Sequence, residues 1–177
     1  MTEIRSETKA DYCAVETLYD LAFAPGRAAL SSYRFRRGLP PITDLCLVIE
    51  DEYSAIVAAI RFWPIRIGDK EAPALLLGPI ATHPIRQGEG LGGLLIAESL
   101  KRAVDLGWKR VVLVGDRPYY ERFGFAPARA FLQFPAPTNP ERVLARALVP
   151  DAWAGVSGMA KRWRDPCAEQ EDDAERQ

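Results

Sequence analysis

The stretch Gln87-Gly88-Glu89-Gly90-Leu91-Gly92-Gly93 places four glycines within six positions. An apolar run that ends at Pro84 precedes it, and an amphipathic helical pattern follows from about Leu94 to Leu106. Glycine is unfavourable in regular structure unless the backbone must turn tightly or approach a ligand closely. The first N–H groups of a helix lack intrahelical partners and carry partial positive charge. The stretch therefore predicts a turn that binds a phosphate-bearing small molecule at the start of a helix.

The chain has 177 residues, of which 48% are hydrophobic and 27% charged, as expected for one globular domain. We expect this domain to span residues 1–163, with an acidic, disordered tail over 164–177. The net charge of -1 gives no basic excess for nucleic acid, and no run approaches the ~20 apolar residues of a membrane span. Three cysteines without metal-ligand spacing predict no metal site and a reduced, cytoplasmic setting.

The hydrophobic pattern predicts an α/β fold. Helical spacing covers Lys9–Phe23, Arg27–Arg37, about Leu94–Leu106 and the short Pro118–Phe123. Strand patterns cover Thr2–Ser6, Asp44–Glu50, Ser54–Ile67, Ala74–Thr82, Arg110–Val114, Ala128–Phe134 and Val143–Val149, and Val156–Trp163 adds an edge strand or a loop.

The arrangement of these strands follows from their connections. Short polar turns join the three strands between Asp44 and Thr82, which predicts an antiparallel meander. A strand, a crossover helix and a second strand predict parallel pairing of Ala74–Thr82 with Arg110–Val114. Gly78-Pro79 interrupts the first of these strands and favours a bulge, because proline has no N–H to donate.

Three templates compete for the glycine turn. Gly88, Gly90 and Gly93 satisfy the dinucleotide fingerprint G-x-G-x-x-G, and an acid follows at Asp116, but an antiparallel meander should not precede such a unit. The P-loop template fits less well, because no Gly-Lys-Ser/Thr occurs, and a purely structural turn needs one glycine rather than four. Gln/Arg-x-x-Gly-x-Gly/Ala is the third template, and Gln87, Gly90 and Gly92 fulfil it.

Residues 80–92, Ile-Ala-Thr-His-Pro-Ile-Arg-Gln-Gly-Glu-Gly-Leu-Gly, resemble the coenzyme A motif of the GCN5-related N-acetyltransferase (GNAT) superfamily. Tyr120–Phe125 resembles the second signature of that family, and the layout from Thr2 to Trp163 is similar. The segment around Gly155–Gly158 resembles a bacterial branch of predicted acetyltransferases. The resemblance implies a mixed, mostly antiparallel, twisted sheet of six or seven strands with helices on both faces and one splayed parallel strand pair.

The resemblance also implies an acetyl-CoA-dependent N-acetyltransferase that moves an acetyl group to an amine by direct attack in a ternary complex. Tyr120 matches the position that protonates the leaving thiolate, and the backbone of Ile80 and Thr82 would pair with the pantetheine arm. The residues that the resemblance assigns to cofactor binding are Ile80, Ala81, Thr82, Gln87, Gly88, Glu89, Gly90, Leu91, Gly92 and Gly93. The alternatives are a longer acyl group, a coenzyme A-binding sensor without turnover, or a dinucleotide-binding protein.

Other candidate groups lie beside these motifs. His83 is the sole histidine, and the resemblance favours a scaffold role for it over that of a general base. Tyr119 is expected to point away from the site. Asp116 has the best location among the acids, but the sequence does not assign it a role.

The acceptor side is the least defined part of the sequence. Arg27, Arg34, Arg36 and Arg37 surround Tyr33 and Phe35, and this run is either a solvated helix face or a pocket for an acidic acceptor. Trp63 either lines that pocket or packs in the core. The acceptor is expected to be a small-molecule or peptide amine, and a homodimer is left open.

Overall fold

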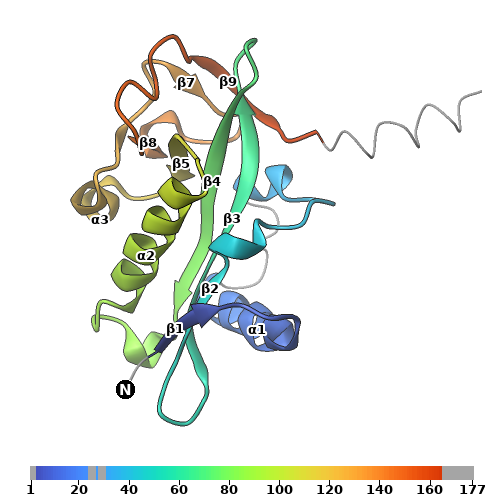
Figure 1. Cartoon of the computed structure of the whole chain (residues 1–177), viewed down its shortest axis with the longest axis vertical. Helices are drawn as coiled ribbons and strands as arrows, with labels where there is room; N and C mark the ends of the chain where they lie inside the picture. The colour runs from blue at the N-terminus through green and yellow to red at the C-terminus, as the bar shows by residue number, and fades with distance from the viewer. Residues whose placement is uncertain (1–2, 24–26, 28–30, 165–177) are drawn as a thin grey trace, which may run out of the picture.

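The computed structural model describes residues 3–23, 27 and 31–164. A single twisted sheet separates helix α1 (Tyr12–Phe23) from helix α2 (Leu91–Asp105), as Figure 1 shows. The short helix α3 (Arg117–Tyr120) lies on the α2 side, and 3₁₀ helix η3 (Ser31–Phe35) lies on the α1 side. The predicted α/β class, with helices on both faces, is confirmed.

The sheet has the strand order β1-β2-β3-β4-β5-β8-β6, and β9 pairs with the far end of β3. In the described part of the chain it has nine strands instead of the expected six or seven, because short edge pairings add β6, β7 and β9. The strands are β1 Glu3–Ser6, β2 Leu47–Glu50, β3 Ile56–Ile67, β4 Ala72–Thr82, β5 Arg110–Val114, β6 Ala126–Pro127, β7 Leu132–Gln133, β8 Val143–Ala147 and β9 Gly158–Arg162.

The two long strands β3 and β4 form the centre of the core. Side chains alternate across a strand, so Ile60 and Phe62 face α2 while Ala59 faces α1. Leu95 and Ile96 of α2 are fully buried against the first face. The predicted meander is confirmed, because β2, β3 and β4 pair antiparallel in succession.

The register of β4 changes at Gly78-Pro79. Ile60 is opposite Ile80 while Phe62 is opposite Leu77, so one residue of β3 faces two residues of β4. This confirms the predicted bulge. It also turns the end of β4 relative to its start.

The predicted parallel pair is β4 with β5, and it is short. Only Leu75 with Val111 and Leu76 with Val112 are paired. Both strands continue beyond these residues, β4 to Thr82 and β5 to Val114, without pairing to each other. The two strands therefore separate at the bulge, as expected for a splayed pair. A second parallel contact, two residues long, joins β7 to β9 at the edge.

Two predicted elements are wrong. Over the described part of Arg27–Arg37 the chain forms 3₁₀ helix η3 and then a turn instead of an α-helix, because Phe35 and Arg36 are both buried by tertiary contacts that override local propensity. The rest of this prediction, 24–26 and 28–30, lies outside the described residues. The strand predicted over Ala128–Phe134 is broken by a turn in which the N–H groups of Phe131 and Leu132 both donate to the carbonyl of Ala128.

The predicted acidic tail lies outside the described residues from 165 onward. Within the part of the chain that the structure describes, no helix combines the length and the apolar character that crossing a membrane requires.

Candidate active site

A cavity of about 380 Å³ lies at the N-terminus of α2, and we call it the turn cavity. All the residues that the sequence assigned to cofactor binding line it, except Glu89 and Gly93. Its lining residues are Ile80, Ala81, Thr82, Arg86, Gln87, Gly88, Gly90, Leu91, Gly92, Tyr119, Tyr120 and Arg122. The fold therefore brings the end of β4, the glycine turn and α3 together around one cavity.

The turn presents backbone N–H groups to this cavity. Gly88 and Gly90 have φ values of 88° and 80°, a left-handed conformation that glycine adopts without steric penalty. Gly90 is the N-cap of α2, and no side chain caps the helix. The amides of the first turn thus lack intrahelical partners and face the cavity with the positive end of the helix dipole. Such a site binds a phosphate or pyrophosphate group.

The other two glycines are required by packing. A Cβ atom built on Gly92 would lie 2.8 Å from the hydroxyl of Tyr119, and one on Gly93 would lie 3.2 Å from the ring of Phe123. The segment Arg117–Phe123 can approach the first turn of α2 only because these positions have no side chain. Helix α2 begins at Leu91, three residues earlier than the pattern from Leu94 predicted.

Tyr119 and Tyr120 both line the turn cavity, with ring centroids 4.8 Å apart and ring planes nearly perpendicular. The expectation that Tyr119 points elsewhere is wrong, because the closeness of α3 to Gly92 places its hydroxyl over the start of α2. The sequence reasoning also missed Arg122. Its guanidinium stacks on Tyr119 at 4.4 Å and brings a positive charge to the cavity.

Tyr120 lies at the end of the gap between β4 and β5. Its ring packs so closely on Gly115, the residue after β5, that a Cβ there would lie 2.5 Å from the ring. Burial, with smaller contributions from the neighbouring Tyr119 and Asp116, raises the pKa of Tyr120 to about 12. The phenol therefore keeps its proton at neutral pH and can donate it.

A smaller cavity of about 120 Å³ fills the gap between the separated strands, and we call it the gap cavity. It shares Ile80 and Tyr120 with the turn cavity. It shares Tyr33, Arg36 and Pro79 with a third cavity on the α1 side. The three cavities therefore adjoin one another at the point where the strands separate.

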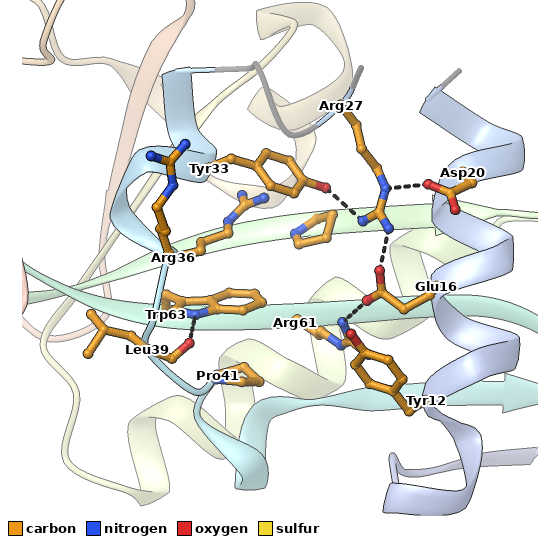
Figure 2. Close-up of a pocket in the computed structure, with 12 residues that line it drawn as sticks. Tyr12, Glu16, Asp20, Arg27, Tyr33, Arg36, Leu39, Pro41, Arg61 and Trp63 are labelled. Carbon is orange, nitrogen blue, oxygen red and sulfur yellow. Dashed lines mark hydrogen bonds and ion pairs between the residues drawn. The ribbon is translucent and has the colours of Figure 1, made fainter. Parts of the chain in front are cut away.

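This third cavity, the arginine cavity, has a volume of about 550 Å³ and lies between α1, the segment 31–41 and β3. Figure 2 shows its walls. The residues that line it are Tyr12, Glu16, Asp20, Arg27, Tyr33, Arg36, Arg37, Leu39, Pro41, Arg61, Trp63 and Pro79. Trp63 fulfils both expected roles. Its side chain is buried and its indole N–H donates to the carbonyl of Leu39 at 3.0 Å, and the residue also lines the cavity.

Two of the arginines in this cavity are matched by carboxylates. Arg61 donates to Glu7 through Nε and Nη2 and to Glu16 through Nη1 at 2.6 Å. Arg27 donates to Glu16 and, at 2.8 Å, to Asp20 (Figure 2). Burial opposes ionisation of Glu16, but the hydrogen bonds from both arginines lower its pKa. Two guanidinium groups and three carboxylates thus form a network of ion pairs along one wall.

Arg36 differs from these two arginines. It is 8% exposed, and among the described residues its buried Nε and Nη1 have no hydrogen-bond partner. Its guanidinium lies 4.2 Å from the ring centroid of Tyr33 and 5.2 Å from that of Trp63. Burial lowers the pKa of Arg36 to about 10, so it remains charged at neutral pH. An unmatched positive charge therefore lies where the arginine cavity meets the gap cavity.

The remaining candidates lie outside the cavities. The imidazole of His83 accepts a hydrogen bond from the N–H of Ile85 at 3.3 Å and caps the short helix η5 (Pro84–Arg86), which is a scaffold role. Asp116 is exposed and pairs with Arg142 at 3.2 Å. Glu89 pairs with Arg86 at 2.6 Å. Across the described residues, no cluster of three or more His, Cys, Asp or Glu side chains has an arrangement that fits a metal ion.

Comparison with known proteins agrees with this geometry. A family model described as "Acetyltransferase (GNAT) domain" matches residues 43–127. The N-acetyltransferase YhbS of Escherichia coli K12 is 26% identical over 159 residues, which cover 89% of this chain and 94% of YhbS.

Solved structures have the same fold. The crystal structure of E. coli YhbS in complex with CoA has a TM-score of 0.81 at 24% identity and covers 92% of this chain and 89% of YhbS. A GNAT acetyltransferase from Brucella melitensis, in complex with acetyl-CoA, has a TM-score of 0.71 at 28% identity and covers 92% and 96% of the two chains. With the splayed strands and the glycine turn, these matches show that the chain is an N-acetyltransferase that carries a GNAT domain over residues 43–127.

Proposed function

We propose that this protein transfers an acetyl group from acetyl-CoA to a primary amine by direct attack within a ternary complex. The observation that supports the proposal is that three cavities adjoin at the splayed strands: the gap cavity shares lining residues with both the turn cavity and the arginine cavity. A cofactor bound on the α2 side and an acceptor bound on the α1 side would meet in the gap. The CoA and acetyl-CoA complexes of the two structural relatives support this choice of cosubstrate.

The turn cavity would hold the cofactor. The free amides of Gly88 and of the first turn of α2 would bind the pyrophosphate, and the dipole of the helix would favour its negative charge. Arg122 and Arg86 line the same cavity and would add positive charge near the phosphates. The edge of β4 that faces the gap, from Ile80 to Thr82, is unpaired toward β5 and would bind the pantetheine arm as an added strand.

Tyr120 would supply the proton that the leaving thiolate takes up. The neutral amine forms a bond to the thioester carbon, the C–S bond breaks, and the sulfur accepts the phenolic proton. The nitrogen releases one proton to water, and the phenolate takes up a proton from water, so that a neutral amide, a thiol and the phenol remain. The raised pKa of Tyr120 keeps this proton in place at neutral pH. A thiol has a pKa near ~8.5 and leaves readily, so the acid need supply only the lower part of the ~10²–10⁴ that is typical of general acid catalysis.

A thermal-shift assay tests the cofactor assignment. Acetyl-CoA or CoA at 100 times its Kd should add ~2.7 kcal/mol to the free energy of unfolding, while NADH and NADPH should give no shift. A shift with the nicotinamide cofactors alone would reverse the assignment. Thiol release on addition of an amine panel then separates an enzyme from a coenzyme A-binding sensor, because a sensor would be stabilised by CoA but would release no thiol with any amine.

A further inference from the structure

We infer that the acceptor is a compact amine that carries a carboxylate, and that Arg36 binds this carboxylate. The inference rests on the proposed function and names the substrate class of the same site. It begins with the contrast between Arg36 and the other arginines of the arginine cavity.

Charge balance in the cavity is uneven. Arg61 and Arg27 are neutralised by Glu7, Glu16 and Asp20. Arg36 has no carboxylate partner among the described residues, although it is almost completely buried. Removing a charge from water without pairing it is strongly unfavourable, because the lost hydration is not replaced. A ligand that carries the missing negative charge would remove this penalty when it binds.

The surroundings of Arg36 orient its guanidinium for an in-plane anion. The aromatic rings of Tyr33 and Trp63 lie against the group. The planar fork of an arginine matches a carboxylate with two parallel hydrogen bonds. Because Nε and Nη1 are closed off from water, the carboxylate reaches them through a small rotation of the Tyr33 ring or of the guanidinium itself.

The position of Arg36 limits the size of the acceptor. Arg36 lines both the arginine cavity and the gap cavity, and Tyr120 lines the gap cavity as well. The anion site therefore adjoins the place where the thioester would react. An acceptor whose amine and carboxylate are separated by only a few bonds would span these two points.

The test compares amines that differ only in charge. Thiol release from acetyl-CoA is measured for the wild-type protein with glycine and glycinamide, β-alanine and β-alaninamide, L-glutamate and L-glutamine, and with aminoethyl phosphate as the phosphate arm. We expect kcat/KM to be about 10- to 100-fold higher for at least one carboxylate than for its amide, which is the range for a hydrogen bond to a charged group. An uncharged amine or aminoethyl phosphate as the preferred acceptor would overturn the inference.

Variants test whether Arg36 causes the preference for a carboxylate acceptor. In Arg36→Gln we expect the preference for the carboxylate to disappear, because kcat/KM falls much more for the carboxylate than for its amide. Arg36→Lys should keep part of the preference, because it retains the charge but loses the planar fork. Arg34→Gln is the matched control: it removes the same charge two residues away, where the exposed Arg34 donates to the carbonyl of Ala136. An equal fall for carboxylate and amide in Arg36→Gln would show that Arg36 serves the common chemistry instead, and would also overturn the inference.

A binding measurement separates failure of the inference from failure of the proposed function. The wild-type protein saturated with CoA is heated with N-acetylglycine or N-acetylglycinamide, and the Arg36→Gln variant is treated in the same way. We expect N-acetylglycine, but not N-acetylglycinamide, to raise the Tm of the wild-type protein. Neither probe should raise the Tm of Arg36→Gln. If CoA stabilises the protein but no amine releases thiol and neither probe shifts the Tm, the carboxylate inference is wrong while cofactor binding stands. If neither acetyl-CoA nor CoA stabilises it, the proposed function itself fails.

Discussion

The turn cavity and the arginine cavity lie on opposite faces of the same sheet and are built in different ways. Backbone groups form much of the first, and two short stretches of sequence, Ile80–Gly92 and Tyr119–Arg122, supply its walls. Side chains form the second, and they come from α1, Arg27, the segment 33–41, β3 and Pro79. One face is therefore specified by local backbone geometry and the other by long-range packing. Substitutions on the two faces should have different effects on stability, turnover and cofactor affinity.

The largest expected effect is a loss of stability when Arg61, which is paired with Glu7 and Glu16, is replaced. Arg61→Met should lower the free energy of unfolding by about 3–5 kcal/mol, because it leaves the carboxylates of Glu7 and Glu16 without their buried partner. Chemical denaturation measures this loss. Arg102→Met is the control, since the partly exposed pair of Arg102 with Glu98 on α2 is worth no more than ~1 kcal/mol. Equal losses in the two variants would mean that the network of Arg61 does not stabilise this wall.

Tyr120 joins the two faces, and its removal should act on the chemical step. Tyr120→Phe should lower kcat by about 10- to 100-fold, because the thiolate must leave without a proton donor. The affinity for acetyl-CoA should stay nearly constant, as measured by thermal shift. Tyr119→Phe is informative beside it, since any effect there should fall on cofactor affinity. If Tyr119→Phe reduces kcat while Tyr120→Phe does not, the proton donor has been assigned to the wrong tyrosine.

The glycine turn gives a test on the backbone side. Gly90→Ala should reduce the affinity for CoA about tenfold, because a left-handed conformation with φ of 80° strains an alanine by roughly 1–2 kcal/mol and displaces the amides of the turn.

The matched control for this change lies at the other end of α2. Gly107 has φ of 86° and, like Gly90, has no atom within 4 Å of the position of an added Cβ. Gly107→Ala should lose similar stability with no change in the CoA-induced thermal shift. An equal fall in CoA affinity in both variants would show that the effect comes from general destabilisation.

The smallest expected effect is a gain in stability, whereas replacement of Arg61 should cause a loss. Arg36→Met should raise the free energy of unfolding by about 1 kcal/mol, because it removes a buried charge that has no partner, and the lost stacking on Tyr33 and Trp63 offsets part of the gain. Arg34→Met, on the exposed face of the same segment, should stay within about 0.5 kcal/mol of the wild type. A clear loss of stability in Arg36→Met would show that this guanidinium is already satisfied within the protein.

Much of the fold could be predicted because its signals are local. The predicted strand Arg110–Val114 matches β5, and the antiparallel meander, the bulge at Gly78-Pro79 and the splayed pair are all present. The errors lie where tertiary contacts override local pattern. The arginine-rich segment is not an α-helix in its described part, and a turn at Ala128 breaks a predicted strand. The pairings of β6 and β7 involve only two residues each and have no periodic signal.

The sequence by itself determined the glycine turn of the proposed cofactor side. A run of glycines before a helical pattern indicates a turn with free amides at the start of a helix, so the proposed anion site could be predicted from seven residues, of which Gly88 and Gly90 have positive φ. Only the tertiary structure decided the acceptor side. Arg34, Arg36 and Arg37 are the same residue type within four positions, and nothing local distinguishes them. Arg36 alone of these three is buried, because Tyr33, Trp63 and Gly78 surround it, and residues distant in sequence set that environment.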